Sequence, residues 1–174
     1  MKKIILYIAL ISFSITSCNG RIRETEQIKA TTSLNTSPDK FIEGKVTRIA
    51  DGDTFTLIFD NGFDVRVRLN GIDSPEKKQA FSKRAKQTLS DLIFDKEVKV
   101  YYKSKDRYGR VLGDVYVGEV NINHEMVRRG MAWHFTRYSE DETLAALEKE
   151  AKKNKIGLWA EAEPVAPWVY RDKQ

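Results

Sequence analysis

Three short turns of the sequence carry carboxylates and arginines at spacings that suit the hydrolysis of a phosphodiester. Residues 51–54 are Asp-Gly-Asp-Thr, residues 106–110 are Asp-Arg-Tyr-Gly-Arg, and between them residues 68–76 run from an arginine through Asp73 to Glu76. Hard divalent cations prefer oxygen ligands, a carboxylate can accept a proton from water, and arginine can hold a phosphate through two parallel N–H bonds. The three turns therefore contain the groups needed for metal-assisted attack of water on phosphorus.

The strand before the middle turn decides which way its arginines point. Residues 64–69 alternate, so their apolar side chains share one face and their arginines share the other. The apolar set is Val65, Val67 and Leu69, and the basic set is Arg66 and Arg68. The pattern breaks at Asn70-Gly71. We therefore expect Arg68, Asp73 and Glu76 to meet at one end of the element that this strand helps to build.

Period-two patterns predict five strands in all, and Asn61-Gly62 is a strong hairpin signal between the second and the third. The apolar residues that mark the strands are Val46 and Ile49 in the first, Phe55, Leu57 and Phe59 in the second, Val65, Val67 and Leu69 in the third, Val98, Val100 and Tyr102 in the fourth, and Val111, Val115 and Val117 in the fifth. The turn at residues 106–110 joins the last two strands.

Three segments have helical spacing instead. Residues 77–94 predict an amphipathic helix, and residues 122–129 predict a short one. A last helix is predicted to begin at Ser139, because its spacing to Glu142 matches a capping box. Residues 161–174 follow that helix and are expected to be extended.

Five strands with a helix between the third and the fourth predict an α+β fold, mainly a five-stranded Greek-key β-barrel of the OB type with three helices, over residues 40–160. Barrels of this type often bind oligonucleotides. The fold alone does not imply catalysis, so the function depends on the residues in the turns.

The beginning of the chain is typical of an export signal. Residues 1–17 contain two lysines, an apolar run too short to span a bilayer, and small residues directly before Cys18. Because Cys18 is the only cysteine, no disulfide can form within the chain, and its position favours a lipoprotein signal in which Cys18 is lipidated. The alternative is an ordinary secretory signal with an incidental cysteine.

Residues 18–39 are rich in Thr, Ser and Asn and predict a flexible tether. We expect an exported lipoprotein, anchored to a membrane through Cys18 and facing outside the cytoplasm. The alternative is a soluble secreted protein.

The cations of the chain are clustered. Cleavage before Cys18 removes two lysines and no acid, so the net charge falls only from +5 to +3. One cluster has no acid among its members and the other has only Asp106: Lys77, Lys78, Lys83, Arg84 and Lys86, and Lys99, Lys103, Lys105, Arg107 and Arg110. Such clusters attract a polyanion with an affinity that falls as salt rises, although solvated faces of a helix and a hairpin would have the same composition.

Taken together, the three turns resemble the staphylococcal (micrococcal) nuclease family, also called the thermonuclease family, in order and in spacing. Residues 123–130 and Gly157-Leu158-Trp159 also resemble family segments, so the similarity extends from about Phe41 to Trp159. The resemblance implies a calcium-dependent endonuclease that hydrolyses DNA and RNA, prefers single-stranded or fraying regions and leaves 3′-phosphate ends. No obligate protein partner is implied, and we expect a monomer.

The resemblance also implies roles for residues of this sequence. Asp53 and Asp73 match the metal-binding carboxylates, and the backbone carbonyl of Ser74 matches a further ligand. Arg68 and Arg110 match the arginines that clamp phosphate. Two carboxylates and one carbonyl leave room for water and a phosphate oxygen on Ca²⁺, and such a site should be weak, with a Kd of roughly 10⁻⁴–10⁻³ M.

Four further residues match the chemistry around these ligands. Glu76 matches the family's candidate general base. Tyr108 matches a tyrosine that contacts phosphate or nucleotide, and Tyr138 matches one that lines the base pocket. Arg107, beside Tyr108 in the same turn, is a further candidate substrate contact.

Two departures from the family pattern affect the expected site. Glu76 runs almost directly into the first helix, where the best-known secreted member has a long loop. That member has a Tyr-x-Tyr pattern where this chain has Thr136 and Tyr138. A neighbouring aromatic residue, Phe135 or Trp133, is a candidate replacement surface for base stacking.

Each motif also has a simpler interpretation when it is taken alone: a surface turn, an exposed arginine, hairpin chemistry, or a helix start with Ser74 as N-cap and Pro75 at the first helical position. His124 and His134 have no partner at metal-ligand spacing, and we expect both to be structural or exposed. The three tryptophans are expected to be packing residues and not platforms for base stacking.

Three functions from different classes therefore compete. The first is the nuclease, and the second is a catalytically inactive OB-fold lipoprotein that only binds nucleic acid. The third, a lipoprotein that binds some other ligand in its barrel, would leave the carboxylates and arginines without a purpose. Because both arginines and the glutamate are present together, the sequence favours the enzyme.

Overall fold

The computed structural model describes residues 40–174 of the chain. The predicted signal, Cys18 and the tether lie in residues 1–39 and therefore outside the described residues. Within residues 40–174 no helix is both long enough and apolar enough to cross a membrane.

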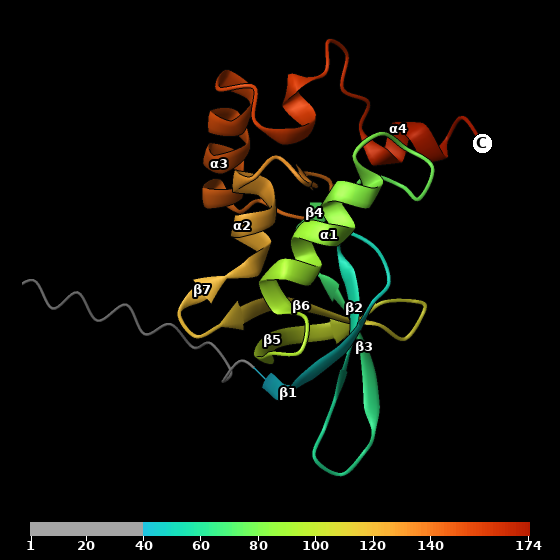
Figure 1. Ribbon diagram of the computed structural model, residues 1–174, viewed down its shortest axis with the longest axis vertical. Coiled ribbons are helices and arrows are strands. Elements are labelled where there is room, and N and C mark those ends of the chain that lie inside the picture. The colour runs from blue at the N-terminus through green and yellow to red at the C-terminus, as the bar shows by residue number, and fades with distance from the viewer. Residues whose placement is uncertain (1–39) are drawn as a thin grey trace, which may run out of the picture. The chain divides into compact units, whose positions relative to one another are not determined.

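Five strands form the barrel that the sequence predicts (Figure 1). They are β1 (Lys40–Ile49), β2 (Thr54–Ile58), β3 (Asp64–Leu69), β5 (Glu97–Lys105) and β6 (Val111–Val117). Neighbours in the order β3-β2-β1-β5-β6 pair antiparallel, and β3 then pairs in parallel with β6, which closes the sheet. Closure pairs both edges of the sheet and brings the end of β3 beside β6. The expected α+β fold with a mainly β barrel is confirmed.

The barrel interior is filled by the apolar residues whose alternation predicts the strands. Phe55, Leu57, Val67, Val100 and Val115 are fully buried. Burial of each large apolar side chain contributes roughly 1.5–3 kcal/mol, so the barrel can be stable through burial alone. The first helix, α1 (Ser82–Ile93), packs against this core through Ala85, Leu89 and Ile93.

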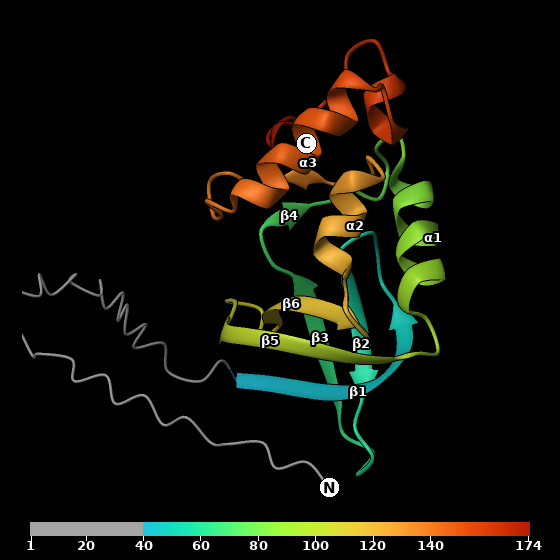
Figure 2. The same ribbon diagram turned by 90° about the vertical axis from the view of Figure 1, so that its left-hand side faces the viewer.

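The remaining elements lie around one end of the barrel (Figures 1 and 2). Two short strands, β4 (Ile72–Asp73) and β8 (Trp133–His134), pair with each other, and β7 (Val120–Asn121) pairs with β6. The other helices are α2 (Ile122–Arg128), α3 (Glu142–Lys153), the 3₁₀ helix η1 (Gly157–Ala160) and α4 (Pro167–Arg171).

Helix α1 is shorter than the sequence predicts, because it begins at Ser82 and not at residue 77. Phe81 has a left-handed backbone with φ of 65°, which no α-helix can continue through. The alternative in which Ser74 caps a helix that starts at Pro75 is therefore wrong. Turns that include the bond from the Gln79 N–H to the Glu76 carbonyl occupy this region instead.

The C-terminal part of the chain departs from the sequence prediction in two places. The N-cap of α3 is Asp141, whose Oδ1 accepts from the Thr143 and Leu144 N–H groups. The predicted cap at Ser139 is wrong, because that hydroxyl accepts from the Asp141 N–H. The tail, expected to be extended, contains the helix α4, so the described residues hold more than three helices.

Candidate functional site

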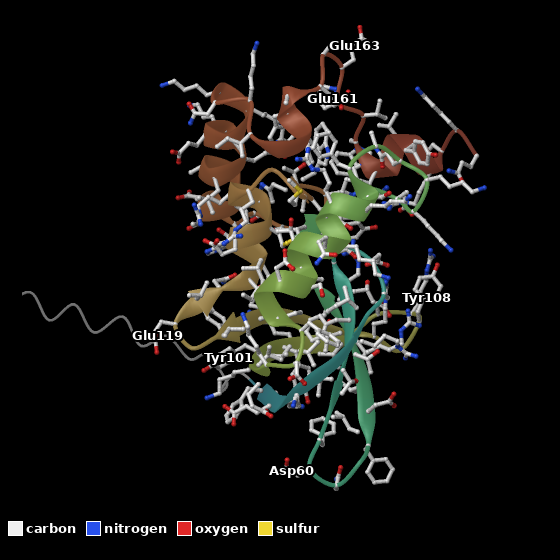
Figure 3. All side chains as sticks on the ribbon, in the orientation of Figure 1. Asp60, Tyr101, Tyr108, Glu119, Glu161 and Glu163 are labelled. Atoms are coloured by element: carbon white, nitrogen blue, oxygen red, sulfur yellow. The ribbon has the colours of Figure 1, made fainter. Side chains whose placement is uncertain are left out.

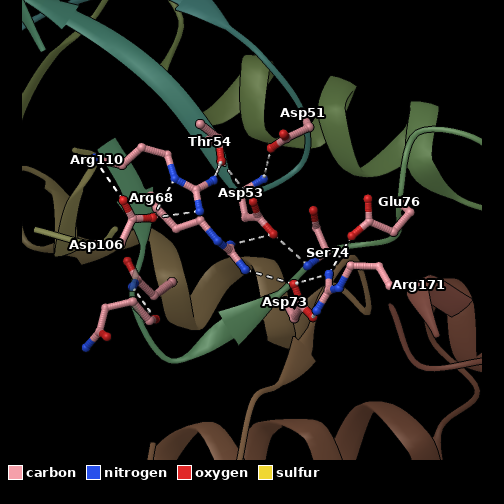
Figure 4. A network of polar contacts seen from close by, with 12 residues as sticks. Asp51, Asp53, Thr54, Arg68, Asp73, Ser74, Glu76, Asp106, Arg110 and Arg171 are labelled. Carbon is pink, nitrogen blue, oxygen red and sulfur yellow. Dashed lines mark hydrogen bonds and ion pairs between the residues drawn. The ribbon is translucent and has the colours of Figure 1, made fainter. Parts of the chain in front are cut away.

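Arg68, near the end of β3, joins carboxylates from two different turns. Its Nη1 lies 2.6 Å from Asp53 Oδ2, and its Nη2 donates to Asp73 Oδ1 at 2.8 Å (Figure 4). The side chain of Arg68 is only 13% exposed, so water screens these ion pairs weakly. The expected meeting of Arg68 and Asp73 at the end of the strand is therefore present.

The turn that carries Asp53 packs tightly against the other side of the site. The Asp53 N–H donates to Asp51 Oδ1 at 3.1 Å, and Asp53 Oδ2 accepts from the Ser74 N–H at 2.7 Å. A Cβ on Gly52 would lie 2.8 Å from the Ser74 Cβ and 2.7 Å from the Ala85 Cβ. Only glycine therefore lets this turn approach Ser74 and α1 closely enough for Asp53 to meet Arg68.

Asp73 is positioned by a small sheet outside the barrel. Gly71 has a φ of 71°, which turns the chain after β3, and its carbonyl accepts from the Phe135 N–H at 2.9 Å. Beyond the turn, Asp73 pairs with Trp133 in the β4–β8 ladder. The Asp73 side chain is only 2% exposed, so its two oxygens can face only the groups packed around it.

Glu76 belongs to the same cluster through a residue that the sequence did not indicate. Arg171, the last residue of α4, forms an ion pair from Nη1 to Glu76 Oε1, and its Nη2 donates to Asp73 Oδ2 at 2.7 Å. The Glu76 N–H donates to Gln79 Oε1 at 3.0 Å. Arg171 therefore bridges the carboxylates of Glu76 and Asp73.

Arg110 approaches the cluster from the β5–β6 turn. Its Nε and Nη2 each lie 2.7 Å from Asp106 Oδ2, and its Nη1 donates to Thr54 Oγ1 at 3.3 Å. The Thr54 hydroxyl in turn lies 3.1 Å from Asp53 Oδ1, where it donates. Because Thr54 pairs with Arg68 across β2 and β3, the two arginines lie on neighbouring parts of the barrel (Figure 4).

Burial and ion pairing shift the pKa values of the site carboxylates in opposite directions. Burial by itself would raise the pKa of Asp53, but the Arg68 guanidinium and the bonds from Ser74 outweigh it and the pKa is lowered. Burial raises the pKa of Asp73, although Arg171 and Arg68 oppose the rise. Burial and the neighbouring Asp53 raise the pKa of Asp51 to about 6. Of these three carboxylates, Asp53 is therefore the one whose ionised form the surroundings favour.

The donor set fits a hard divalent cation. Arg68 contacts Asp53 Oδ2 and Asp73 Oδ1 at once, which shows that the two carboxylates converge from separate turns. Calcium accepts such oxygen donors in flexible geometry and completes its shell with water. Within residues 40–174 no group of three or more His, Cys, Asp or Glu side chains is placed to hold a metal ion, so the candidate set has only Asp53 and Asp73 as side-chain ligands. The contact that Ser74 makes with the site is through its backbone N–H, which donates to Asp53 Oδ2.

The candidate substrate contacts lie farther out. Tyr108 is 65% exposed on the β5–β6 turn (Figure 3), with the guanidinium of Arg107 4.9 Å and that of Arg110 5.5 Å from its ring centre. Tyr138 is 68% exposed and packs edge-on against Phe135 at 4.8 Å. The Tyr108 N–H donates to Asp106 Oδ1 at 2.9 Å, and among the described residues neither tyrosine hydroxyl is hydrogen-bonded to Asp53, Asp73 or Glu76. Cys18 lies outside the described residues.

The two candidate replacements for the missing tyrosine belong to an aromatic cluster. Phe135 stacks on Trp168 of α4 at 5.1 Å with planes 9° apart, so one face of its ring is covered. Trp133 lies edge-on to Trp159 at 4.3 Å and to Trp168 at 5.7 Å. The tryptophans therefore pack against one another, as expected, and tie α4 to the loop before Tyr138.

The histidines have structural neighbours. His134 Nε2 lies 3.2 Å from Ser139 Oγ, and His124 Nε2 lies 3.4 Å from Asp141 Oδ2.

Of the residues that build the site, the sequence missed Arg171 and did not assign a role to Thr54. A proline at the first position of α4 is a helix-start signal that could have indicated an ordered tail.

Comparison with known proteins gives independent evidence from the sequence. Residues 66–161 match the family model described as staphylococcal nuclease homologue. A protein of Escherichia coli named as an uncharacterized endonuclease is 43% identical over 134 residues, which cover 76% of this chain and 87% of the relative. The micrococcal nuclease of Shigella flexneri is 45% identical over 139 residues, which cover 74% of this chain and 79% of the relative.

A plant protein is similar to this chain at nearly the same level of sequence identity. A staphylococcal-like nuclease of Arabidopsis thaliana is 41% identical over 106 residues, 61% of this chain and 33% of the relative. The family model covers more than half of the chain, and the bacterial relatives are matched over most of their length. The chain therefore belongs to the staphylococcal nuclease family and is a hydrolase of its micrococcal endonuclease type.

Proposed function

We propose that this enzyme is a calcium-dependent endonuclease that hydrolyses DNA and RNA, prefers single-stranded or fraying regions and leaves 3′-phosphate ends. The observation that carries the proposal is the double contact of Arg68 with Asp53 and Asp73, because it gathers a cation's carboxylates and a phosphate-binding arginine at one point. The family resemblance supports the substrate class and the choice of calcium.

Asp53, Asp73 and the Ser74 carbonyl would hold the cation. A bound Ca²⁺ would supply a positive charge for a phosphate oxygen and a place for water. The protein's own part is to fix the donors: the Ser74 N–H and Arg68 both hold Asp53 Oδ2, at 2.7 Å and 2.6 Å, so that carboxylate has little freedom to rotate.

Arg68 and Arg110 would hold the scissile phosphate. Arg68 Nη1 is buried and lies 2.6 Å from Asp53 Oδ2, so a phosphate oxygen would have to enter beside that carboxylate to reach it. Arg110 is oriented by Asp106 and Thr54. Donors fixed in this way stabilise the charge that builds on the phosphate oxygens as water attacks.

Glu76 would accept the proton of the attacking water. The Glu76 side chain is 35% exposed and pairs with Arg171, so its carboxylate lies at the exposed side of the cluster. The P–O5′ bond would break as the new P–O bond forms, and the phosphate would remain on the 3′ end. Because Glu76 would take a proton from the water, the attacking oxygen would have the character of hydroxide.

Basic side chains next to Glu76 also suit a polyanionic substrate. Lys77, Lys78, Lys83 and Arg84 line a shallow depression at the start of α1, together with Glu161. Their phosphate contacts would strengthen binding in a salt-dependent way without adding sequence preference.

The direct test is cleavage of single-stranded DNA by the purified full chain, with calcium and with a chelator. We expect calcium-dependent cleavage that the double variant Arg68→Ala with Glu76→Gln loses by about 10³-fold or more. Arg66→Ala is the matched control, since Arg66 lies on the same strand and is exposed. Phosphatase treatment followed by ligation would identify the ends. Binding without cleavage under every divalent cation would favour the inactive nucleic-acid-binding protein.

We further propose that the enzyme is exported and anchored to a membrane through a lipid on Cys18. The support is the signal-like composition of residues 1–17 and the position of the single cysteine. Mass spectrometry of the membrane fraction should find a diacylated Cys18 at the mature N-terminus. An unmodified soluble product that starts elsewhere would support the secreted alternative.

A further inference from the structure

The C-terminal helix α4 brings a third arginine into the site from outside the segment that matches the family model. That segment ends at residue 161, whereas Arg171 is the last residue of α4. Its Nη2 lies 2.7 Å from Asp73 Oδ2, its Nη1 lies 3.4 Å from Asp73 Oδ1, and Nη1 also pairs with Glu76 Oε1. One guanidinium therefore spans a candidate metal ligand and the candidate base (Figure 4).

Several contacts hold α4 against the domain. Trp168 stacks on Phe135, and Pro167 at the start of the helix is buried. Gln79 connects both sides, because its Nε2 donates to the Val165 carbonyl and its Oε1 accepts from the Glu76 N–H. The arginine is thus presented by a docked helix and not by a free side chain on a tail.

Arg171 is also the cation that faces Glu76. Arg68 pairs only with Asp53 and Asp73, so Arg171 is the arginine that pairs with Glu76. The Asp73 and Glu76 carboxylates share this guanidinium, and without a cation between them their like charges would repel each other. Without Arg171, the Glu76 side chain, which is 35% exposed, would lose its ion-pair partner and turn toward water.

The contact between Arg171 and Asp73 also competes with the binding of a cation to Asp73. Arg68 takes Asp73 Oδ1 and Arg171 takes Oδ2, so arginines occupy both oxygens. A divalent cation bound to Oδ2 would repel a guanidinium 2.7 Å from that atom. The bond to Glu76 comes from Nη1, so it does not use the Asp73 oxygen that a cation would take.

We propose that Arg171 is a positioning residue of the nuclease site: it holds the Glu76 carboxylate beside Asp73, and it yields its Asp73 contact to the divalent cation. The inference rests on the proposed function, because it assigns Arg171 to the same reaction. It makes the ordered C-terminal helix part of the active site.

A single substitution should then move two measurements in opposite directions. Arg171→Gln removes the positive charge beside Asp73, so calcium should bind several-fold more tightly in isothermal titration of the full chain with CaCl₂. The same change frees Glu76, so kcat on single-stranded DNA at saturating calcium should fall about 10–100-fold, the range typical of residues that orient a metal site. A variant whose site had merely loosened would lose both calcium affinity and kcat.

Two further variants separate charge from geometry. Arg171→Lys keeps the charge without the planar fork, so calcium affinity should stay near that of the wild type while kcat recovers only in part. Lys173→Gln removes the same charge from an exposed residue just beyond α4 and should change neither quantity. Trp168→Ala, which removes the stack on Phe135, should undock the helix and reproduce the pattern of Arg171→Gln.

The result that overturns the inference is unchanged or weaker calcium binding in Arg171→Gln, or an unchanged kcat, beside an active wild type. That outcome leaves the proposed function in place. A wild type that cleaves no nucleic acid under any divalent cation overturns the proposed function itself, whatever the calorimetry of the variant shows.

Discussion

The side-chain amide of Asn123 donates to the backbone carbonyl of Asn70 at 2.8 Å and so ties α2 to the turn that leads into the site. The same side chain accepts from the Val115 N–H at 3.0 Å and donates to the Gly113 carbonyl at 3.2 Å. Asn123 is 1% exposed. One buried amide therefore satisfies backbone groups of both β6 and the β3–β4 turn.

Asn123→Ala should destabilise the fold by about 2–3 kcal/mol, because it leaves buried donors and acceptors without partners. Urea unfolding of the full chain would measure this. Gln87→Ala is the control, since Gln87 is exposed on α1 and its side chain bonds only Asp91 among the described residues. A loss below 0.5 kcal/mol, the size of an ordinary surface change, would show that water can replace the amide.

Arg110→Ala should cut kcat by about 10²–10³-fold while the free energy of unfolding changes little, because its proposed role is to bind charge on the phosphate. Steady-state cleavage at saturating calcium, beside thermal unfolding, would measure both. Lys105→Ala, a nearby exposed change on β5, is the control for general loss of positive charge. Near-normal turnover would remove Arg110 from the phosphate clamp.

Asp53→Asn should weaken calcium binding by at least about tenfold, since a neutral amide oxygen replaces a charged ligand. Titration of the full chain with CaCl₂ would measure the Kd. Asp64→Asn removes a carboxylate at the start of β3, at the far end of the strand from Arg68, and serves as the control. An unchanged affinity in Asp53→Asn would exclude Asp53 from the metal site.

The barrel could be predicted from the sequence because apolar side chains recur at every second position of its strands. Val65, Val67 and Leu69 have this pattern, and the structure places Arg68 on the other face of the same strand. The start of α1 could not be predicted in this way. It depends on the left-handed backbone of Phe81, and helical periodicity carries no information about one dihedral angle.

Part of the site could likewise be predicted from the sequence, and part of it could not. The strand pattern indicated that Arg68 and Asp73 would meet, and the family resemblance added Asp53. All three lie at turns that the barrel brings to one end. Arg171 is 98 positions from Asp73, and its place depends on the stacking of Trp168 against Phe135. A contact of that kind arises from tertiary packing and leaves no periodic signal in the sequence.

The cap of α3 gives a prediction about acid stability. Burial alone would raise the pKa of Asp141, but the N–H groups of Leu144 and Thr143 and the nearby His124 outweigh it, and the pKa lies below the usual value of an aspartate. A carboxyl whose pKa is lowered by folding stabilises the fold above its unfolded pKa. That stabilisation is lost as the pH falls through the folded value.

Asp141→Ala should therefore cost about 1 kcal/mol of unfolding free energy at pH 7, the usual value of an N-cap. The difference from the wild type should shrink as the pH falls below about 3.8. Urea unfolding of both chains at pH 7 and near pH 2.5 would test this, with Asp141→Asn as the control, because asparagine can cap at either pH. A difference of the same size at both pH values would mean that the Asp141 charge contributes nothing to the cap.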